Sequence, residues 1–191
     1  MAGNAVFVGT NRLMQKRLLF NSQSLDITID RLCQQLIENH DTFEGSVILG
    51  MQPRGVFLAD RIGQKLRHLT GRQVPAGRLD TTFFRDDFRR RESPLTPNTT
   101  HVPFIIEEKK VVLIDDVLFT GRTVRAALDA MIAFGRPKKV ELLVLVDRKY
   151  SRELPIEPFY VGRQVNTILS QRVLVEWKEQ GAAEDAIWLI T

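Results

Sequence analysis

The chain has 191 residues, of which 43% are hydrophobic and 26% are charged, and its formal net charge is +4. This length is enough for one domain with a buried core, and no stretch reaches the roughly 18 apolar residues that a membrane span needs. The single cysteine, Cys33, excludes an intramolecular disulfide framework and fits a reducing cytoplasm. The mildly basic charge is compatible with phosphate ligands or RNA and does not select between them.

The N-terminal part predicts a flexible extension followed by an amphipathic helix. Residues 1–13 are small and polar with little periodicity, so we expect a single folded domain over residues 14–191. Either Asn21 or Ser22 can cap the helix that follows. Cys33 shares the apolar face of this helix and is expected to pack in the core. The face is defined by residues at helical spacing: Leu25, Ile29, Leu32, Leu36 and Ile37.

Next, a short apolar strand runs through a turn into a helix. The strand is predicted at 46–50 and the helix at 56–66, with a glycine-bracketed loop between them. Backbone N–H groups at such a turn can bind phosphate, and the planar guanidinium of Arg54 suits a diphosphate. The candidate pyrophosphate-binding residues are therefore Gln52, Pro53, Arg54 and Gly55. Taken alone, the loop also fits a plain turn.

A charged segment follows this unit. Residues 78–84 alternate in polarity and are predicted to form a strand, with 104–106 as its returning partner. The residues between them, 85–98, have mixed charge and no apolar period. They fit either a lid that excludes water from a reactive sugar or the solvated tip of a β-arm. The candidate lid residues open this loop: Arg85, Asp86 and Asp87.

The strongest pattern lies at residues 111–123. Four apolar residues predict a buried strand, and Asp115 and Asp116 follow at its carboxyl end, where α/β sheets bind their ligands. Residues 120–123 then form a small-residue turn that opens a helix. Its N–H groups, two hydroxyls and the guanidinium of Arg122 make a phosphate cradle. Two acids beside such a cradle suit a sugar phosphate with free hydroxyls and a bound divalent cation.

The C-terminal part adds one long apolar strand, at 138–147, which ends in Asp147 and Arg148. Shorter strands are predicted at 159–161, 173–177 and 187–190. Together the elements predict one α/β domain. Its mostly parallel sheet is flanked by helices and carries a long β-arm lid and a small β-rich hood. In this topology the strand ends at Gly50, Asp115 and Asp147 meet at one edge of the sheet.

Other catalytic mechanisms find no support in the sequence. His40, His68 and His101 are scattered and lack the spacing of metal ligands. Neither a Gly-x-Ser-x-Gly elbow nor a Walker loop is present. What remains is transfer or hydrolysis at an activated sugar phosphate.

Residues 111–123 resemble the phosphoribosyl-pyrophosphate (PRPP) motif of type I phosphoribosyltransferases. That motif has four apolar residues, two acids, two apolar residues, one variable residue, Thr-Gly, a variable residue and Thr. The resemblance extends from Leu19 to Ile190 and is to the pyrimidine-operon regulator family (PyrR), whose members double as uracil phosphoribosyltransferases. The most similar stretches are 50–55, 80–87, 120–126, 135–137 and 144–155.

The resemblance implies that uracil attacks the anomeric carbon of Mg²⁺-bound PRPP and releases pyrophosphate, giving UMP. Asp115 and Asp116 would hold the ribose hydroxyls, and Arg54 completes the expected catalytic set. Mg²⁺ would be held by PRPP and water rather than directly by the protein. Uracil would dock against Val146, Asp147 and Arg148. The rest of the PRPP site would comprise Val117, Leu118, Phe119, Thr120, Gly121, Arg122 and Thr123.

Phe119 bears on the choice of base. Purine phosphoribosyltransferases of this class carry an acid immediately before Thr-Gly, where it serves the purine N7. The ring of Phe119 cannot exchange a proton there, which favours uracil over hypoxanthine or guanine. The alternatives are a purine phosphoribosyltransferase and an RNA-binding regulator with only vestigial enzyme activity.

The resemblance also implies transcription attenuation, in which a homodimer or higher homo-oligomer binds leader mRNA of the pyr operon with UMP. The expected RNA contacts are Arg31, Arg148, Lys149 and Arg152. Two stretches differ from the family pattern. Pro53 replaces the usual Thr, and the segment from Asp147 to Pro155 is one residue longer and lacks the usual His.

Overall fold

The computed structural model describes residues 15–86 and 97–191, and its centre is a five-stranded parallel sheet of order β3-β2-β4-β5-β6. The predicted extension at 1–13 and the lid residue Asp87 lie outside the described residues. The central strand β4 is almost entirely buried, as expected for a parallel sheet covered on both faces. The strands are β2 (Ser46–Met51), β3 (Ala76–Leu79), β4 (Lys110–Leu118), β5 (Lys139–Lys149) and β6 (Tyr160–Asn166).

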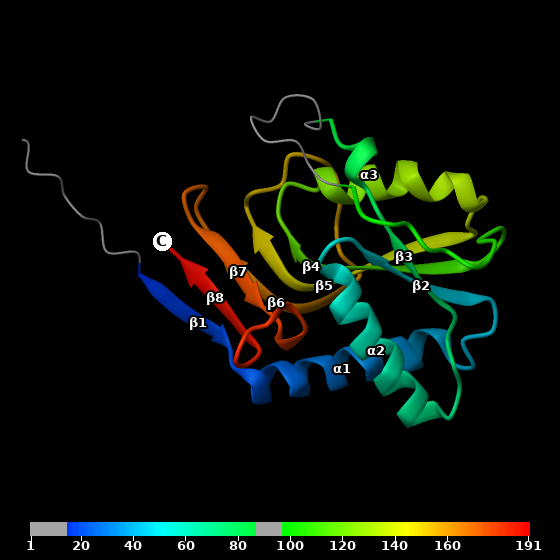
Figure 1. Ribbon diagram of the computed structural model, residues 1–191, viewed down its shortest axis with the longest axis horizontal. Coiled ribbons are helices and arrows are strands. Elements are labelled where there is room, and N and C mark those ends of the chain that lie inside the picture. Colours follow the sequence, from blue (N-terminus) through cyan, green and yellow to red (C-terminus); the bar gives the residue numbers. More distant parts are fainter. Residues whose placement is uncertain (1–14, 87–96) are drawn as a thin grey trace, which may run out of the picture.

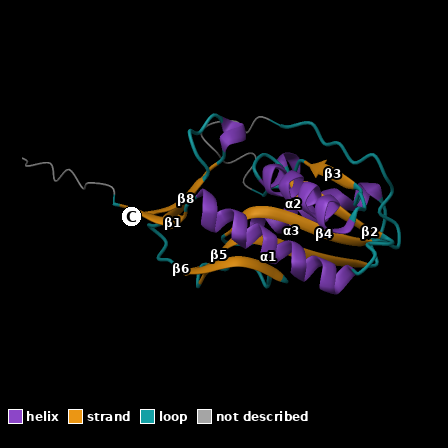
Figure 2. Cartoon of the chain, turned by 90° about the horizontal axis from the view of Figure 1, so that it is seen from below, coloured by secondary structure: helices purple, strands orange, loops and turns teal. Residues whose placement is uncertain are grey.

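Helices α1 (Ser22–His40) and α2 (Gly55–Thr70) cover one face of the sheet, and α3 (Arg122–Met131) covers the other (Figures 1 and 2). Successive side chains of β4 alternate between the two cores. Val112 and Ile114 join the core beneath α1 and α2, whereas the residues on either side of Val112 join the core beneath α3. The predicted mostly parallel α/β fold with flanking helices is therefore confirmed.

A separate three-stranded antiparallel sheet of order β1-β8-β7 forms the hood. It is made of β1 (Lys16–Phe20), β7 (Arg172–Glu176) and β8 (Ala186–Ile190), and in Figure 1 the blue β1 lies beside the red β8. Leu19, Val175, Trp177, Ile187 and Leu189 attach the hood to the core beneath α1 and α2. Strand β1 was not predicted, because its partner lies at the opposite end of the chain.

The prediction of a strand over residues 78–84 is wrong beyond Leu79. Residues Thr82–Phe84 form a short 3-10 helix, η1. The carboxylate of Asp80 accepts hydrogen bonds from the backbone N–H of Thr82 at 3.3 Å and from its hydroxyl at 2.7 Å. These bonds turn the chain immediately after β3, so the alternating polarity does not continue as a strand.

The predicted returning strand at 104–106 is also wrong. The N–H of Ile106 donates to the carbonyl of Phe134, just beyond α3, and not to β3. Within the described residues, Arg78 of the first predicted arm forms an isolated bridge with His101, which precedes the second arm. The β-arm of the predicted lid is thus not formed in the part of the chain that the structure describes.

Candidate active site

The acid pair lies inside β4 rather than after it. The residues that follow, Val117 and Leu118, still pair with β5. The backbone N–H of Asp116 donates to Oδ1 of Asp115 over 2.9 Å. Nε of Arg54, in the turn before α2, forms an ion pair of 3.0 Å with Oδ2 of Asp116. A cation from the neighbouring strand–helix turn therefore balances part of the charge of the pair.

Both acids are shifted toward the protonated form. Burial raises the pKa of Asp115 well above its usual range, and the negative charge of Asp116 raises it further. Burial also raises the pKa of Asp116, although the guanidinium of Arg54 opposes this shift. A ligand that brings hydroxyl donors or developing positive charge relieves the unfavourable burial of two carboxylates.

The turn before α2 packs tightly against the end of β4. A Cβ atom at Gly55 would lie 2.5 Å from the carbonyl oxygen of Ile114, so only glycine allows this approach. No described side chain caps the first turn of α2, which leaves its N–H groups for a bound anion. The side-chain amide of Gln52 donates to the carbonyl of Thr99, and the Gln52–Pro53 peptide bond is cis.

The turn before α3 has the same construction. Gly121 precedes the helix with a φ of 91°, a conformation that glycine adopts without strain. Gly121 has no side chain with which to cap α3, and the N–H of Arg122, the first residue of the helix, donates to the hydroxyl of Thr120 over 3.4 Å. The carbonyl of Thr120 accepts hydrogen bonds from the N–H groups of Glu153 and Leu154, at 3.0 and 3.2 Å. The backbone after β5 therefore holds the candidate phosphate loop in place.

Two arginines tie this loop to its surroundings. Arg122 forms an ion pair with Glu153 at 2.7 Å and a second one with Asp86. Arg85 donates to the hydroxyl of Thr123 over 2.9 Å. The two described residues of the predicted lid, Arg85 and Asp86, thus contact the candidate phosphate loop directly.

A cavity of about 260 Å³ joins the predicted parts of the site. Eight of the predicted residues line it: Gln52, Pro53, Arg54, Arg85, Asp115, Asp116, Val117 and Thr123. The acid pair, the turn before α2 and the start of α3 therefore share one space. The carboxyl ends of β2 and β4 therefore meet at this cavity, whereas Asp147, near the end of β5, lines another one.

Three residues that line the cavity were not predicted, namely Thr81, Thr82 and Asn98. Asp80 organises them, because its carboxylate accepts hydrogen bonds from the hydroxyl of Thr82 and from the N–H of Asn98 at 3.2 Å. An acid followed by two threonines was the available sequence signal. It was missed because those residues were assigned to a strand.

The residues predicted to contact uracil offer little exposed surface to a ligand. Val146 is 0% exposed and belongs to the core, so it offers no surface to a base in this structure, whereas the partly exposed Val117 lines the cavity. Arg148 is only 4% exposed. Asp147 lines a second cavity, of about 450 Å³, which Arg152 also lines.

The arginines predicted to contact RNA make hydrogen bonds or ion pairs with other residues of the protein. Arg31 donates to the carbonyls of Val161 and Gly162 on the edge strand β6. Arg152 donates to the carbonyl of Phe119 and pairs with Asp147, and Arg148 is buried. Of these three, Arg31 remains exposed to solvent, and its contact with RNA stays a prediction. The side chain of Lys149, the fourth candidate, makes no hydrogen bond or ion pair with the described part of the chain.

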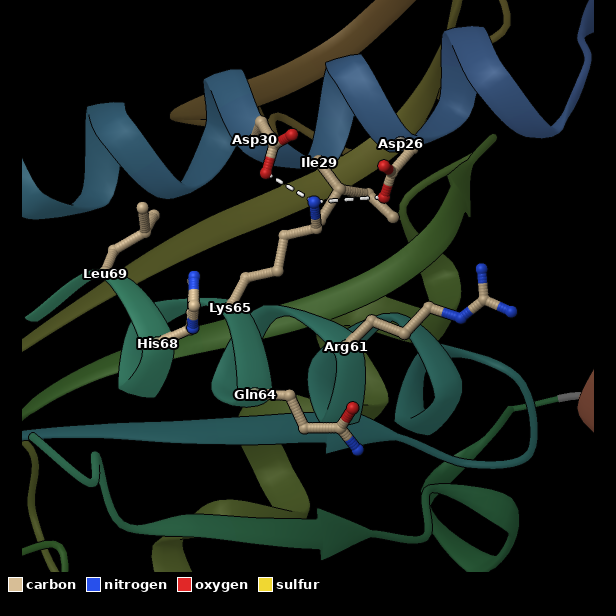
Figure 3. A pocket seen from close by; sticks show the side chains of 8 residues that line it. All are labelled: Asp26, Ile29, Asp30, Arg61, Gln64, Lys65, His68 and Leu69. Atoms are coloured by element: carbon tan, nitrogen blue, oxygen red, sulfur yellow. Dashed lines mark hydrogen bonds and ion pairs between the residues drawn. The ribbon is translucent and has the colours of Figure 1, made fainter. Parts of the chain in front are cut away.

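A larger hollow, of about 460 Å³, lies elsewhere, between α1 and α2 (Figure 3). In it Lys65 of α2 forms ion pairs with Asp26 at 3.0 Å and Asp30 at 2.5 Å, both on α1. The single positive charge of Lys65 is thus shared between two carboxylates. No residue from the ends of β2, β4 or β5 lines this hollow. We therefore place the functional site at the smaller cavity.

Comparisons with known proteins show the family of this chain. The family described as phosphoribosyl transferase domain matches residues 17–180, and the chain belongs to this family. Within it, the chain belongs with the bifunctional protein PyrR. It is 44% identical over 175 residues to that protein of Desulfosudis oleivorans, covering 91% of this chain and 96% of the relative. It is 39% identical over 171 residues to that of Enterococcus faecalis, with 90% and 95% covered.

Solved structures share the fold at low sequence identity. The hypoxanthine phosphoribosyl transferase of Trypanosoma cruzi matches with a TM-score of 0.70 and 13% identity, over 92% of this chain and 91% of that one. A hypoxanthine-guanine phosphoribosyltransferase of Bacillus anthracis matches with a TM-score of 0.65 and 16% identity, over 94% and 99%. Among the described residues, no helix is long and apolar enough to cross a membrane.

Proposed function

We propose that this protein is a uracil phosphoribosyltransferase that converts uracil and PRPP to UMP and pyrophosphate. One observation carries the proposal. A buried acid pair shares a single cavity with the N-terminal turns of two helices whose N-cap residues make no side-chain capping bond. Such an arrangement fits a molecule that has both free hydroxyls and several phosphate groups.

In this proposal the acid pair acts on the ribose. Asp115 and Asp116 accept hydrogen bonds from the 2′ and 3′ hydroxyls and stabilise the positive charge that develops on the ring as pyrophosphate leaves. The turn at Thr120–Thr123 binds the 5′-phosphate, and the turn with Arg54 faces the pyrophosphate. Uracil replaces pyrophosphate directly at the anomeric carbon, so no covalent enzyme intermediate is required.

Magnesium is the metal proposed for the substrate complex. The described residues contain no group of three or more His, Cys, Asp or Glu that could hold a metal alone. This donor set fits an ion held mainly by substrate oxygens and water, with Asp115 and Asp116 close to it. When bound, Mg²⁺ neutralises charge on the pyrophosphate group.

Phe119 supports a pyrimidine as the acceptor base. Its ring lies against the guanidinium of Arg148, with the guanidinium carbon 3.8 Å from the ring centre. An apolar ring held in this way offers no proton acceptor or donor to a purine N7. The cytoplasm supplies both proposed substrates and is the proposed location.

The direct test is product formation by the purified protein with Mg²⁺ and PRPP. We expect UMP with uracil, and at most traces of IMP or GMP with hypoxanthine or guanine. Formation of IMP or GMP without UMP would replace this proposal with a purine phosphoribosyltransferase. Binding of PRPP without turnover of any base would favour a regulator with vestigial activity.

A second function, UMP-dependent binding of pyr leader mRNA, rests on the bifunctional character named in the relatives. Arg148 is buried, so among the four residues expected to contact RNA the exposed Arg31 and the side chain of Lys149, which is unpaired within the described residues, are the better placed to reach a phosphate. Phosphate contacts of this kind weaken as salt rises.

The RNA function is tested by gel shift with pyr leader RNA, with and without UMP, over a series of salt concentrations. A leader with the same composition in scrambled order is the control. A shift that depends on both sequence and UMP supports attenuation. Equal binding of both RNAs, or no binding, would remove RNA control from the proposal.

A further inference from the structure

Arg148, at the end of β5, is a buried cation with an unusual set of neighbours. Within the described residues it forms no ion pair with a carboxylate. Its Nε donates to the hydroxyl of Thr167 over 3.0 Å, and Nη2 donates to the carbonyls of Gln171 at 2.7 Å and Ile168 at 3.3 Å. All three acceptors belong to the turn that joins β6 to β7 of the hood.

The flat face of the same guanidinium packs on Phe119, at 3.8 Å from the ring centre. Phe119 immediately precedes Thr120, the first residue of the candidate phosphate loop. One side chain therefore joins the hood turn through its hydrogen bonds and the phosphate loop through its planar face. Lysine has neither the fork of donors nor the planar face, so it cannot make both contacts.

Phe119 is held from its backbone as well. Arg152 donates one guanidinium N–H to the carbonyl of Phe119 and another to the carboxylate of Asp147. Two arginines, from β5 and from the segment after it, thus fix the ring and the carbonyl of one residue. Such double support is unnecessary for a simple turn, but it maintains a defined distance between two parts of a binding site.

We infer that Arg148 is a positioning residue for the acceptor base, which sets the separation between the hood turn and the phosphate loop through the ring of Phe119. The inference rests on the proposed function. Arg148 does not touch the base in this role. It holds the two walls between which a base must fit, so its loss weakens base binding while the PRPP-binding cavity stays intact.

The test combines Arg148→Lys, which retains the charge, with Phe119→Leu, which removes the ring, and with the double variant. We expect each single change to raise the KM for uracil about tenfold, because small misplacements at a reacting pair are costly. For Arg148→Lys, the Kd for Mg²⁺-PRPP, measured by calorimetry without uracil, should change less than about twofold, because Arg148 does not line the PRPP cavity. The KM for uracil of the double variant should not exceed that of either single variant, because both changes remove the same contact between Arg148 and Phe119.

Phe119→Tyr keeps the ring and should raise the KM for uracil less than Phe119→Leu does, because the contact with Arg148 is retained. Arg67→Lys, on the exposed side of α2, is the matched control and should change neither constant. Thermal unfolding of every variant identifies any that fail to fold.

An unchanged KM for uracil in both single variants would overturn the inference. Equal losses for uracil and PRPP would also overturn it, because they would show a general structural role. If the unmodified protein bound PRPP but formed no UMP, the proposed function itself would fail, and the inference would fall with it.

Discussion

At the scale of single residues, Gly55 decides how closely α2 approaches the acid pair. A Cβ atom there would meet the carbonyl oxygen of Ile114 at 2.5 Å and Cα of Asp115 at 3.0 Å. Both are backbone atoms that cannot move independently, so Gly55→Ala must displace either the helix or the strand. We expect it to lower the free energy of unfolding by about 1–3 kcal/mol and to weaken PRPP binding. Urea unfolding and calorimetry measure the two effects.

Gly63 in the same helix provides the matched control. A Cβ atom at Gly63 would have no atom within 4 Å, and its backbone is helical. We expect Gly63→Ala to stabilise the protein by about 0.5–1 kcal/mol, because glycine lowers helix stability. Equal effects at the two glycines would show that close packing at Gly55 does not matter.

The acid pair provides the second prediction at this scale. In Asp115→Asn/Asp116→Asn, both charges near the developing positive charge are lost while the shape is kept. We expect kcat for UMP formation to fall by at least about 100-fold, with the fold retained. Asp129→Asn, an exposed change on α3, is the control. Activity of the double variant at the level of the unmodified protein would contradict the proposed mechanism.

At the scale of elements, a buried polar cluster joins α1, β2 and β5 at the end of the sheet away from the site. The ring of His40 is 2.9 Å from the hydroxyl of Ser46 and 2.9 Å from the carboxylate of Glu141. Tyr160 donates its hydroxyl proton to the same carboxylate over 3.0 Å. Each polar group of the cluster has a partner, which is what makes its burial tolerable.

This cluster predicts how stability depends on pH. Burial lowers the pKa of His40 from 6.5, although Glu141 opposes the shift and Lys110 and Lys139 reinforce it. The unfolded chain then binds a proton more readily than the folded one, so stability is full above pH 6.5 and falls as the pH decreases below it. Burial alone would raise the pKa of Glu141, but its hydrogen bonds lower it below 4.5. Glu141 therefore adds a further loss of folding stability as the pH falls below 4.5.

We therefore expect the free energy of unfolding, measured in urea, to be lower at about pH 5.5 than at about pH 7.5. In His40→Gln the difference between the two pH values should be smaller, because the imidazole that takes up a proton on unfolding has been removed. His68→Gln, on the exposed side of α2, is the control. If the free energy of unfolding of His40→Gln still differs by the same amount between the two pH values, groups other than His40 cause the dependence.

At the scale of the whole molecule, Arg61 of α2 clamps the hood to the sheet domain. Its guanidinium donates to Glu179 at 2.8 and 2.9 Å and to Asp185 through two bonds of 2.8 Å. It also lies 4.6 Å from the ring centre of the buried Trp177. Removal of this arginine leaves the mostly buried Asp185 without its main cation.

Arg61→Met is therefore expected to lower the free energy of unfolding by about 1–3 kcal/mol, because hydrogen bonds to charged groups are lost. It should also raise the KM for uracil more than that for PRPP, since the hood is expected to border the base. Arg67→Met is exposed on the same helix and should change little. Loss of stability in both variants alike would show that the clamp has no special role.

Several features of this protein were determined by local sequence. Residues 111–123 specify a strand, an acid pair and a candidate phosphate-binding turn within one stretch, and hydrophobic periodicity was enough to predict α1. The turn at Gln52–Gly55 was predicted for the same reason. In each case the strand, the turn and the functional side chains are neighbours in the chain, so short-range sequence patterns are enough to predict them.

Other features depended on contacts between distant segments, and only the tertiary structure decided them. Strand β1 exists because β8 lies beside it, and burial in the core removed Val146 from the base site. Arg148 appeared to be a surface contact for RNA, yet its acceptors lie about twenty positions away and its ring partner is Phe119. A charged residue in a sequence has no fixed partner. Folding determines whether its charge faces a ligand or holds two parts of the protein together.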